Sequence, residues 1–413
     1  MDGAAYSDGV TAVDIADECR AIQDRIVAWR RAIHRRPETG LELPETMRFV
    51  ERTLSSFGIA PRRVGPGVAG TLFGAGRAPG AAACIAIRAD ADALPIQEET
   101  GLPFSSEIPG AMHACGHDAH VAMALGAAAV LASRRESLAG AVKFIFQPGE
   151  ESPGGAEPMI EAGVLDDPPV RAIVSCHVGN IFLEARAAGI IGVRSGTMTA
   201  SCDNLLIRVK GRGGHGAMPH LAVDSILVAS HVVTALQSLI SRETKPTASG
   251  VVSIGKISGG FAANVIAPQV VMEGTIRALD PGTRAQLCHR TAEICRSVAA
   301  AMRAEAEVTI SPGYPPAVND PDVTGFLRGV AEDLFGSDRV RELSDPMMGS
   351  EDMAYFLERV PGTIFGLGTW SGDPDTQYPH HHPRFDIDES VLWMGSALFA
   401  ETAVRWLERN AGG

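Results

Sequence analysis

The sequence predicts an α/β protein: a larger domain built on a mostly parallel sheet, interrupted by a smaller α+β domain. Short apolar runs alternate with helical segments near both ends of the chain, which is typical of parallel strands joined by right-handed crossovers. Between them the order changes to strand, helix, strand, strand, helix, strand, which indicates a ferredoxin-like sandwich. We therefore predict that 1–196 and 312–413 form the larger domain and that 197–311 form the insertion.

The larger domain begins with helical sequence and continues as alternating strands and helices. Residues 22–57 predict two helices, interrupted at HRRPETG, where Pro37 and Gly40 break the helical pattern. Short apolar runs predict buried strands at 84–88, 141–147, 170–176 and 363–368. Helical patterns predict helices at 118–133, 156–165, 322–335, 351–359 and 389–409.

The predicted order of strands and helices changes near residue 197, where the inserted domain begins. Strands are predicted at 204–210, 250–257, 268–279 and 305–311, and helices at 222–241 and 281–303. The Pro-rich stretch SPGYPPAVNDP follows the last of these strands, and the alternation of helices and buried strands that is typical of the larger domain resumes after it.

The composition is that of an ordinary globular protein and excludes several kinds of partner. Of 413 residues, 45% are hydrophobic and 21% charged, and the formal net charge is −13. This charge disfavours nucleic acid and anionic membrane surfaces because repulsion opposes every approach. The N-terminus lacks a signal-peptide pattern, no long apolar run occurs, and seven scattered cysteines are unlike a disulfide framework. We predict a cytoplasmic protein that binds neither nucleic acid nor membranes.

Polar clusters follow the predicted strands of the larger domain at the point where each strand ends. The clusters are Asp90 and Asp92 after 84–88, Glu150 and Glu151 after 141–147, His177 after 170–176, and His380–His382 after 363–368. Ligands of open α/β sheets bind beyond the carboxyl ends of the strands, so these clusters are expected to share one edge.

The stretch AMHACGHDAH concentrates metal-binding side chains before a predicted helix. Cys115 and His117 are two residues apart, so in an extended segment they project to the same side. Thiolate, imidazole and carboxylate are the usual ligands of zinc and related ions. Together with Glu151, His177 and a distal histidine, they supply enough donors for two divalent ions, which could activate a shared water.

The adjacent residues Glu150 and Glu151 are expected to have different roles. In an extended chain Glu150 and Glu151 point in opposite directions, so one can bind metal while the other accepts a proton from water.

His120 and His231 lie in helical stretches and are interpreted as packing or surface residues. An isolated cysteine or Glu-Glu pair is usually structural or solvated, so the metal prediction depends on the shared location of the clusters.

The ordered set of motifs resembles the two-metal amidohydrolases that include aminoacylases, hippurate hydrolases and plant hormone amide-conjugate hydrolases, a branch of the aminoacylase and carboxypeptidase metallopeptidases. The resemblance covers nearly the whole chain. It is carried, in the family's order, by RRAIHRRPETGLELPET, IRADADALPI, MHACGHDAH, FQPGEE, CHVG, GRGGHGAMPHLAVD, ANVIAP, EGTIRALD, GSEDMAYF and HHPRFDIDE.

The resemblance implies roles for residues of the larger, catalytic domain. It implies five metal ligands, namely Cys115, His117, Glu151, His177 and His381. It also implies that Glu150 is the general base and that Asp92 supports the site by orienting a ligand. Gly149 stands where the family commonly has alanine, and Gly179-Asn180-Ile181 replace an aromatic residue and prolines, which predicts a differently shaped acyl pocket.

The resemblance further implies that the insertion is a lid and dimerisation domain. His215 matches a lid histidine that reaches the substrate carbonyl, often from a partner subunit, as an oxyanion donor. Asn264 and Arg277 match positions associated with the substrate, and Arg277 suits a carboxylate. An edge strand of the insertion could pair across a two-fold axis, which predicts a homodimer.

These inferences predict a metal-dependent amidohydrolase that converts an N-acyl amino acid to a carboxylic acid and a free amino acid. Two divalent ions, zinc or manganese, are its predicted cofactors. One alternative is a metal-independent thiol hydrolase with Cys115 as nucleophile. The other is a metal-dependent binding protein without turnover.

Overall fold

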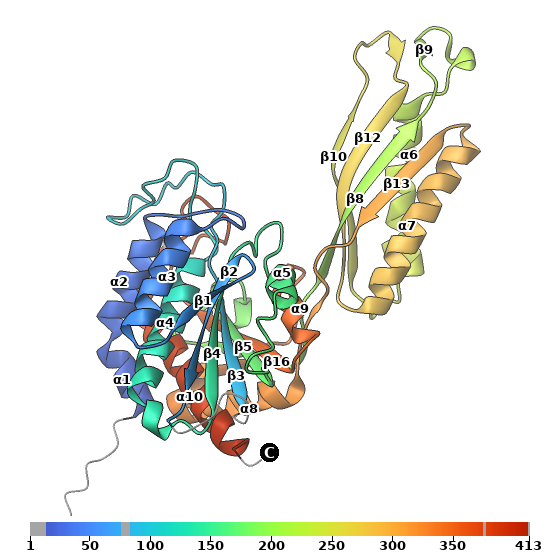
Figure 1. Ribbon diagram of the computed structural model, residues 1–413. Helices are drawn as coiled ribbons and strands as arrows, with labels where there is room; N and C mark the ends of the chain where they lie inside the picture. The colour runs from blue at the N-terminus through green and yellow to red at the C-terminus, as the bar shows by residue number, and fades with distance from the viewer. Residues whose placement is uncertain (1–13, 76–82, 375–376, 412–413) are drawn as a thin grey trace, which may run out of the picture. The chain divides into compact units, whose positions relative to one another are not determined.

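A computed structural model describes residues 14–75, 83–374 and 377–411 (Figure 1). The chain divides into two compact units. Unit 1 comprises the described residues of Met1–Val193, Asp320–Leu343 and Val360–Gly413, and unit 2 comprises Arg194–Asn319 and Ser344–Arg359. No helix among the described residues is both long and apolar enough to cross a membrane.

Unit 1 is built on a mixed sheet of eight strands. Their order across the sheet is β1 (Pro61–Val64), β2 (Gly67–Phe73), β4 (Ala141–Gln147), β3 (Cys84–Asp90), β5 (Ala172–Gly179), β16 (Gly362–Gly368), β6 (Ile191–Val193) and β15 (Val340–Glu342). The four central strands β4, β3, β5 and β16 run parallel, whereas β1, β2 and β6 pair antiparallel with a neighbour. Because β3, β4, β5 and β16 are buried along their whole length, they consist of nearly continuous apolar runs.

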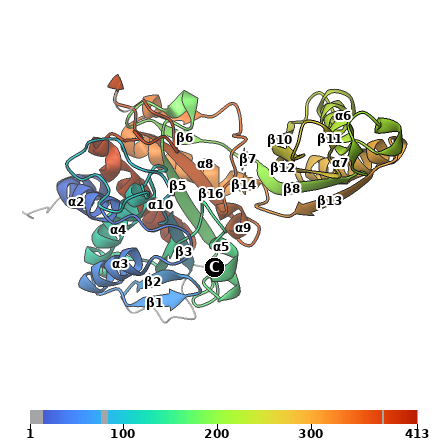
Figure 2. The ribbon, with the colours of Figure 1, turned by 90° about the horizontal axis from the view of Figure 1, so that it is seen from above.

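Helices of unit 1 form layers against this sheet. They are α1 (Ile15–Ala21), α2 (Gln23–His34), α3 (Pro44–Ser56), α4 (His117–Ser133), α5 (Ala156–Glu161), α8 (Pro321–Phe335) and α10 (Leu392–Arg409). Of these, α3, α4, α8 and α10 contact the strands, and α1 and α2 pack on α4 and α10 as a second layer. Figure 2 shows α5 on the opposite side of the sheet from α3 and α4.

The central helix α4 is buried on nearly all sides, and small residues make this possible. A Cβ atom on Gly126 would lie 2.3 Å from Oγ of Ser396, and one on Gly395 would lie 2.2 Å from the sulfur of Met123. These glycines let α4 and α10 approach closely, and the helix that begins with His117 is fixed by packing along its whole length.

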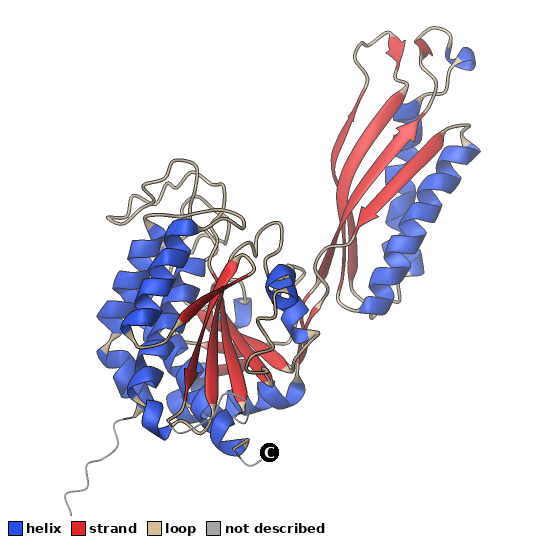
Figure 3. Ribbon diagram, in the orientation of Figure 1, coloured by secondary structure: helices blue, strands red, loops and turns tan. Residues whose placement is uncertain are grey.

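Unit 2 is a four-stranded antiparallel sheet with two helices on one face (Figure 3). Its main elements are β8 (Ser201–Lys210), α6 (Ser225–Ser238), β10 (Gly250–Gly259), β12 (Gln269–Ala278), α7 (Pro281–Ala301) and β13 (Glu305–Ser311). The strand order β10-β12-β8-β13 is that of a ferredoxin-like sandwich, as predicted. Alternate residues of β8, such as Leu205, Ile207 and Val209, face a core that they share with α6 and α7.

Short elements complete unit 2 at its two ends. At one end β9 (Gly214–His215) pairs with β11 (Val265–Ile266), and at the other β7 (Gly196–Thr199) pairs with β14 (Ala317–Asn319). The predicted helix at 351–359 is the shorter α9 (Met353–Leu357). It belongs to unit 2 rather than to the last segment of the larger domain, because α9 contacts β14.

Candidate metal centre

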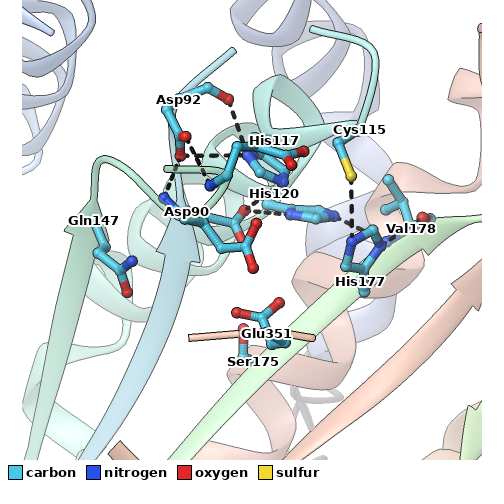
Figure 4. A network of polar contacts seen from close by, with 12 residues as sticks. Asp90, Asp92, Cys115, His117, His120, Gln147, Ser175, His177, Val178 and Glu351 are labelled. Carbon is cyan, nitrogen blue, oxygen red and sulfur yellow. Dashed lines mark hydrogen bonds and ion pairs between the residues drawn. The ribbon is translucent and has the colours of Figure 1, made fainter. Parts of the chain in front are cut away.

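The polar clusters predicted at the strand ends lie at one edge of the unit 1 sheet. Because β4, β3, β5 and β16 are parallel neighbours, their carboxyl ends meet there. Asp90 ends β3, the turn with Glu150 follows β4, His177 lies near the end of β5, and the loop after β16 carries His381. Figure 4 shows the side chains from β3, β5 and the start of α4 gathered above the strand ends.

A tight turn, and not an extended segment, brings Cys115 and His117 to this edge. Gly116 has a φ of 85°, and His117 is the first residue of α4. A Cβ atom on Gly116 would lie 2.5 Å from Cγ2 of Val178, so the close approach of the turn to β5 requires glycine. The prediction of an extended segment is wrong, yet the two side chains still converge. Sγ of Cys115 lies 3.6 Å from Nε2 of His177.

Glu150 and Glu151 also lie in a turn, which the carboxylate of Asp92 holds. The backbone N–H of Glu150 donates to Oδ1 of Asp92 at 2.9 Å, and that of Glu151 donates to Oδ2 at 3.1 Å. Gly149 precedes the pair with a φ of 74°, which explains why glycine stands there. The expected alternation of an extended chain is therefore wrong. A carboxylate oxygen of each glutamate nevertheless lies within 4.8 Å of a ring nitrogen of His117.

Backbone carbonyls fix the orientation of the two histidines. Nδ1 of His117 donates to the carbonyl of Asp92 at 2.9 Å, and Nδ1 of His177 donates to the carbonyl of Val178 at 2.9 Å. A carbonyl oxygen only accepts, so each Nδ1 carries a hydrogen and Nε2 is the ring nitrogen left to bind a metal ion. This is the arrangement in which a histidine binds metal through Nε2.

Of the adjacent histidines in the last loop, His381 is the one that turns toward the glutamates. Its Nε2 lies 3.1 Å from Oε1 of Glu151, and Sγ of Cys115 belongs to the same group of atoms within 4.8 Å. The backbone of His381 has a φ of 65°, which is uncommon for a residue with a side chain. Nε2 of His380 instead donates to the carbonyl of Val178 at 3.0 Å.

The electrostatics of this edge favour a bound cation. Burial raises the pKa of the Cys115 thiol well above its usual value, and Glu151 and Glu150 raise it further. Burial disfavours a charged His117, but the carboxylates of Asp90, Asp92 and Glu151 together outweigh burial and raise the pKa of His117 to about 10. Carboxylates thus hold protons on the neighbouring thiol and imidazole, and a metal ion would take the place of those protons.

The donor set fits divalent metal ions. Nε2 of His117 is buried and makes no hydrogen bond to any described residue. Thiolate, imidazole and carboxylate suit zinc, and imidazole and carboxylate also suit manganese. Among the described residues, the donors of five sets lie within 4.8 Å of one another, and three of these sets are made of the predicted ligands and base, namely Cys115, His117 and His177; Cys115, Glu151 and His381; and His117, Glu150 and Glu151. This edge of unit 1 is therefore a candidate metal centre.

Comparison with known protein families decides the class. The family model described as peptidase family M20/M25/M40 matches residues 86–405. The chain belongs to peptidase family M20/M25/M40.

Similarity to members of this family extends over nearly the whole chain. The chain is 37% identical over 392 residues to the N-acetyl-L-cysteine deacetylase of Bacillus subtilis (strain 168), covering 94% of this chain and 90% of that protein. It is 39% identical over 391 residues to the IAA-amino acid hydrolase ILR1-like 4 of Arabidopsis thaliana, covering 93% and 86%. The solved structure of the Bacillus subtilis YXEP protein, described as a dinuclear metal binding peptidase from the M20 family, matches with a TM-score of 0.80 at 35% identity, covering 94% and 99%.

These matches confirm the predicted family, the α/β fold with its inserted domain and the prediction of a hydrolase. They also favour the metal-dependent amidohydrolase over both alternatives.

Three residues predicted for the substrate site of this M20-family chain lie in unit 2, at opposite ends of its sheet. His215 of β9 is exposed, and the loop residue Asn264 accepts a hydrogen bond from Gly216 through its carbonyl, so these two neighbour each other. Arg277 pairs across the sheet with Cys202, at the far end of β8. The length of β8 separates the two places by on the order of 25 Å.

The structure adds His120, which the sequence interpretation left out, and gives a place in the site to Asp90, which the sequence put in a polar cluster without a role. His120, expected to be a packing or surface residue, is buried beside the predicted ligands, where its Nδ1 lies 2.5 Å from Oδ1 of Asp90. A signal for His120 existed in the sequence, since residues three apart on a helix lie on one face and His117 precedes it by three. Asp90 had a similar signal, because it occupies the very end of a central strand.

Proposed function

We propose that this protein is a metal-dependent amidohydrolase that cleaves the amide bond of N-acyl amino acids. The observation that carries the proposal is the convergence of one thiol, several imidazoles and two carboxylates at a single buried edge of the sheet. The family assignment supports the class of reaction. The names of two relatives, an N-acetyl-L-cysteine deacetylase and an IAA-amino acid hydrolase, support the class of substrate.

Two divalent ions are the proposed cofactors, with zinc or manganese as the candidates. They would be held by Cys115, His117, Glu151, His177 and His381. Bound at this edge, such ions would polarise the acyl carbonyl and lower the pKa of a nearby water. The overlapping donor sets support two ions rather than one, because Cys115 and Glu151 each belong to two sets.

Glu150 is the proposed general base. Its carboxylate would take a proton from the attacking water and return that proton to the nitrogen of the leaving amino acid. Asp92 supports this role without touching substrate, because its two oxygens hold the backbone N–H groups of Glu150 and Glu151. In this way one carboxylate would fix both the base and a ligand in their relative positions.

The residues of unit 2 would contribute from two subunits. His215 is the proposed oxyanion donor, with Asn264 beside it, and Arg277 is the proposed partner of the substrate carboxylate. An N-acyl amino acid is far shorter than the sheet that separates His215 from Arg277 in one chain. We therefore infer a homodimer in which a site takes Arg277 from one subunit and His215 from the other.

The acyl group and the compartment are also part of the proposal. Acetyl, benzoyl and indole-acetyl groups are the candidates for the acyl side, with a free amino acid as the second product. A cytoplasmic location is supported by the seven cysteines, all of which are free thiols, as expected in a reducing compartment.

Metal analysis combined with a substrate panel tests the proposed function. The purified protein is expected to contain two divalent ions per chain and to release amino acid from at least one of N-acetyl, N-benzoyl and indole-acetyl amino acids. Removal of metal with a chelator should abolish the release, and zinc or manganese should restore it. Chelator-resistant turnover or metal-bound protein without turnover on any substrate would contradict the proposal.

A further inference from the structure

The imidazole of His120 is fully engaged within the protein. It is 1% exposed, and its Nε2 accepts a hydrogen bond of 2.9 Å from the backbone N–H of Val178. Because a peptide N–H can only donate, Nε2 is an acceptor and Nδ1 carries the ring hydrogen. Nδ1 then donates to Oδ1 of Asp90 at 2.5 Å. His120 is therefore a neutral ring in one tautomer, and it has no lone pair left for a metal ion.

The carboxylate of Asp90 is itself held from the other side. Oδ2 of Asp90 lies 2.6 Å from Nη1 of Arg88, and Nε of Arg88 donates to Oε1 of Gln147 at 3.0 Å. All four side chains are at most 1% exposed. The chain of contacts from Gln147 through Arg88, Asp90 and His120 to Val178 thus links β4, β3, α4 and β5. Figure 4 shows Asp90, His120 and Val178 of this chain beside His117 and His177.

Val178 connects this chain of contacts to the predicted ligands. It follows His177 directly, and its carbonyl accepts hydrogen bonds from Nδ1 of His177 and Nε2 of His380. Holding the N–H of Val178 therefore positions a residue on which the orientation of two imidazoles depends. Gly179 has a φ of 116°, and a Cβ atom there would lie 2.3 Å from the His380 ring, so this end of β5 is closely packed.

The ring of His120 also lies between two predicted ligands. Its centroid is 5.4 Å from that of His117, with the rings stacked, and 5.0 Å from that of His177, with the rings edge to face. His117 and His120 lie on one face of α4 because they are three residues apart. The ring is therefore a spacer between a helix that carries one ligand and a strand that carries the other.

We propose that His120 is a positioning residue that, anchored by Asp90, sets the spacing and orientation of His117 and His177 before any metal binds. This inference rests on the proposed function, since it assigns His120 a role toward the two imidazoles that would bind metal. Neither His120 nor Asp90 is a ligand in this assignment. Burial together with the neighbouring imidazoles lowers the pKa of His120 to about 4, which agrees with a neutral ring.

The test replaces His120 by phenylalanine, which keeps a ring as a spacer and removes both hydrogen bonds. In the metal-free protein, the amide hydrogen of Val178 should exchange faster with solvent in His120→Phe than in the wild type. In the cobalt-substituted protein, the visible absorption bands should shift. Metal affinity should fall by about 10- to 100-fold, the usual effect of losing an outer hydrogen-bond partner, while the number of ions bound at saturation stays that of the wild type.

Two further variants make the result decisive. His231→Phe, on the exposed side of α6 in unit 2, is the matched control and should leave all three readouts unchanged. Asp90→Asn keeps an acceptor for His120 and loses the charge that pairs with Arg88, so it should weaken metal binding without lowering the number of ions bound. If His120→Phe does not fold, Asp90→Asn carries the test.

The outcomes separate this inference from the proposed function. Wild-type exchange, cobalt spectrum and metal affinity in His120→Phe, or in Asp90→Asn when the phenylalanine variant does not fold, would overturn the positioning role and leave the amidohydrolase proposal intact. Loss of one bound ion in Asp90→Asn would make Asp90 a ligand and would also overturn it. A wild-type protein that binds no divalent ion would instead overturn the proposed function.

Discussion

The two units of this protein present their predicted functional residues in contrasting ways. In unit 1, His117 is 1% exposed, and its ring is fixed by the carbonyl of Asp92. In unit 2, His215 is exposed, and its Nδ1 accepts only a hydrogen bond from the backbone of Ala217 two residues away. Unit 1 holds its donors in place by contacts among buried groups from several strands, whereas His215 is held by its own turn.

The difference shows where the precision of such a site comes from. Buried polar groups in unit 1 are expensive unless they are paired, so their positions are strongly determined by their partners. A residue on an exposed turn has no such constraint and acts only when another surface meets it. We expect substitutions of the predicted metal ligands in unit 1 to alter metal binding, and substitutions of the predicted substrate residues in unit 2 to alter turnover while metal binding stays unchanged.

The largest expected effect is a loss of turnover on substitution of Glu150, a buried residue of unit 1. Glu150→Gln should reduce kcat by roughly 10²- to 10⁴-fold, because the amide cannot take a proton from water. Metal content, measured by atomic emission, should stay at the wild-type value. Glu161→Gln, an exposed substitution at the end of α5, is the matched control and should keep full activity. Full activity in Glu150→Gln would remove the general base from the mechanism.

The corresponding prediction for unit 2 concerns His215. His215→Ala should reduce kcat by roughly 10²- to 10³-fold, the usual effect of removing an oxyanion donor. Because the side chain is exposed, metal content and melting temperature should not change. His220→Ala, also exposed in the same segment, should behave like the wild type. A fall in metal content in His215→Ala would contradict the separation between the units.

Mixed dimers of two variants test whether His215 acts in its own subunit or in that of its partner. When the inactive variants His215→Ala and Glu150→Gln are mixed and allowed to exchange subunits, a quarter or more of the wild-type activity should return if His215 serves the partner's site. No recovery in exchanged dimers would place His215 and Glu150 of one active site in the same subunit.

A smaller effect distinguishes the adjacent histidines of the last loop of unit 1. His381→Ala should weaken metal binding by at least the ~10- to 100-fold seen for outer partners, because Nε2 of His381 lies beside Glu151. His380→Ala should weaken it less, since Nε2 of His380 is committed to the carbonyl of Val178. Competition with a fluorescent chelator measures both. Equal losses in the two variants would contradict the assignment of His381.

The smallest expected effect concerns stability, through buried charges of unit 1 behind the start of α4. Nδ1 of His34 lies 2.7 Å from Asp118, and Nε2 lies 3.3 Å from Glu98. Burial disfavours the charged ring, but Asp118 and Glu98 outweigh burial and raise the pKa of His34 from 6.5 to about 9. The raised pKa means that His34 contributes its full stabilisation below pH 6.5 and loses it as the pH rises through 9.

Thermal unfolding between pH 6 and 10 measures this contribution. The free energy of unfolding should fall by a few kcal/mol at most across the range, and the fall should be smaller in His34→Asn, which cannot titrate. Burial opposes ionisation of Glu98, yet its hydrogen bonds with His34 and Thr100 lower its pKa from 4.5 to about 2, so its own contribution is lost as the pH falls from 4.5 to 2, below the range of this test. The same pH dependence in His34→Asn and in the wild type would contradict the prediction.

Much of the site could be predicted because its residues lie at the carboxyl ends of parallel strands, and those strands can be recognised in the sequence. Asp90, Glu150 and His177 each follow or end an apolar run, and a run of that kind is readable without any tertiary contact. The local backbone could not be predicted in the same way. The turns at Gly116 and Gly149 depend on positive φ angles and on a neighbour such as Val178, which is 62 residues beyond Gly116 in the chain.

The sequence by itself determined the class of fold, the order of its elements and the set of residues that can bind metal, because apolar periodicity and residue chemistry are local properties. Only the tertiary structure decided that His381 rather than His380 faces Glu151, that His120 is buried between two other imidazoles, and that Arg277 lies far from His215. Those facts depend on which strands become neighbours and on how closely they pack. That choice is made by burial over the whole chain and not by any segment of it.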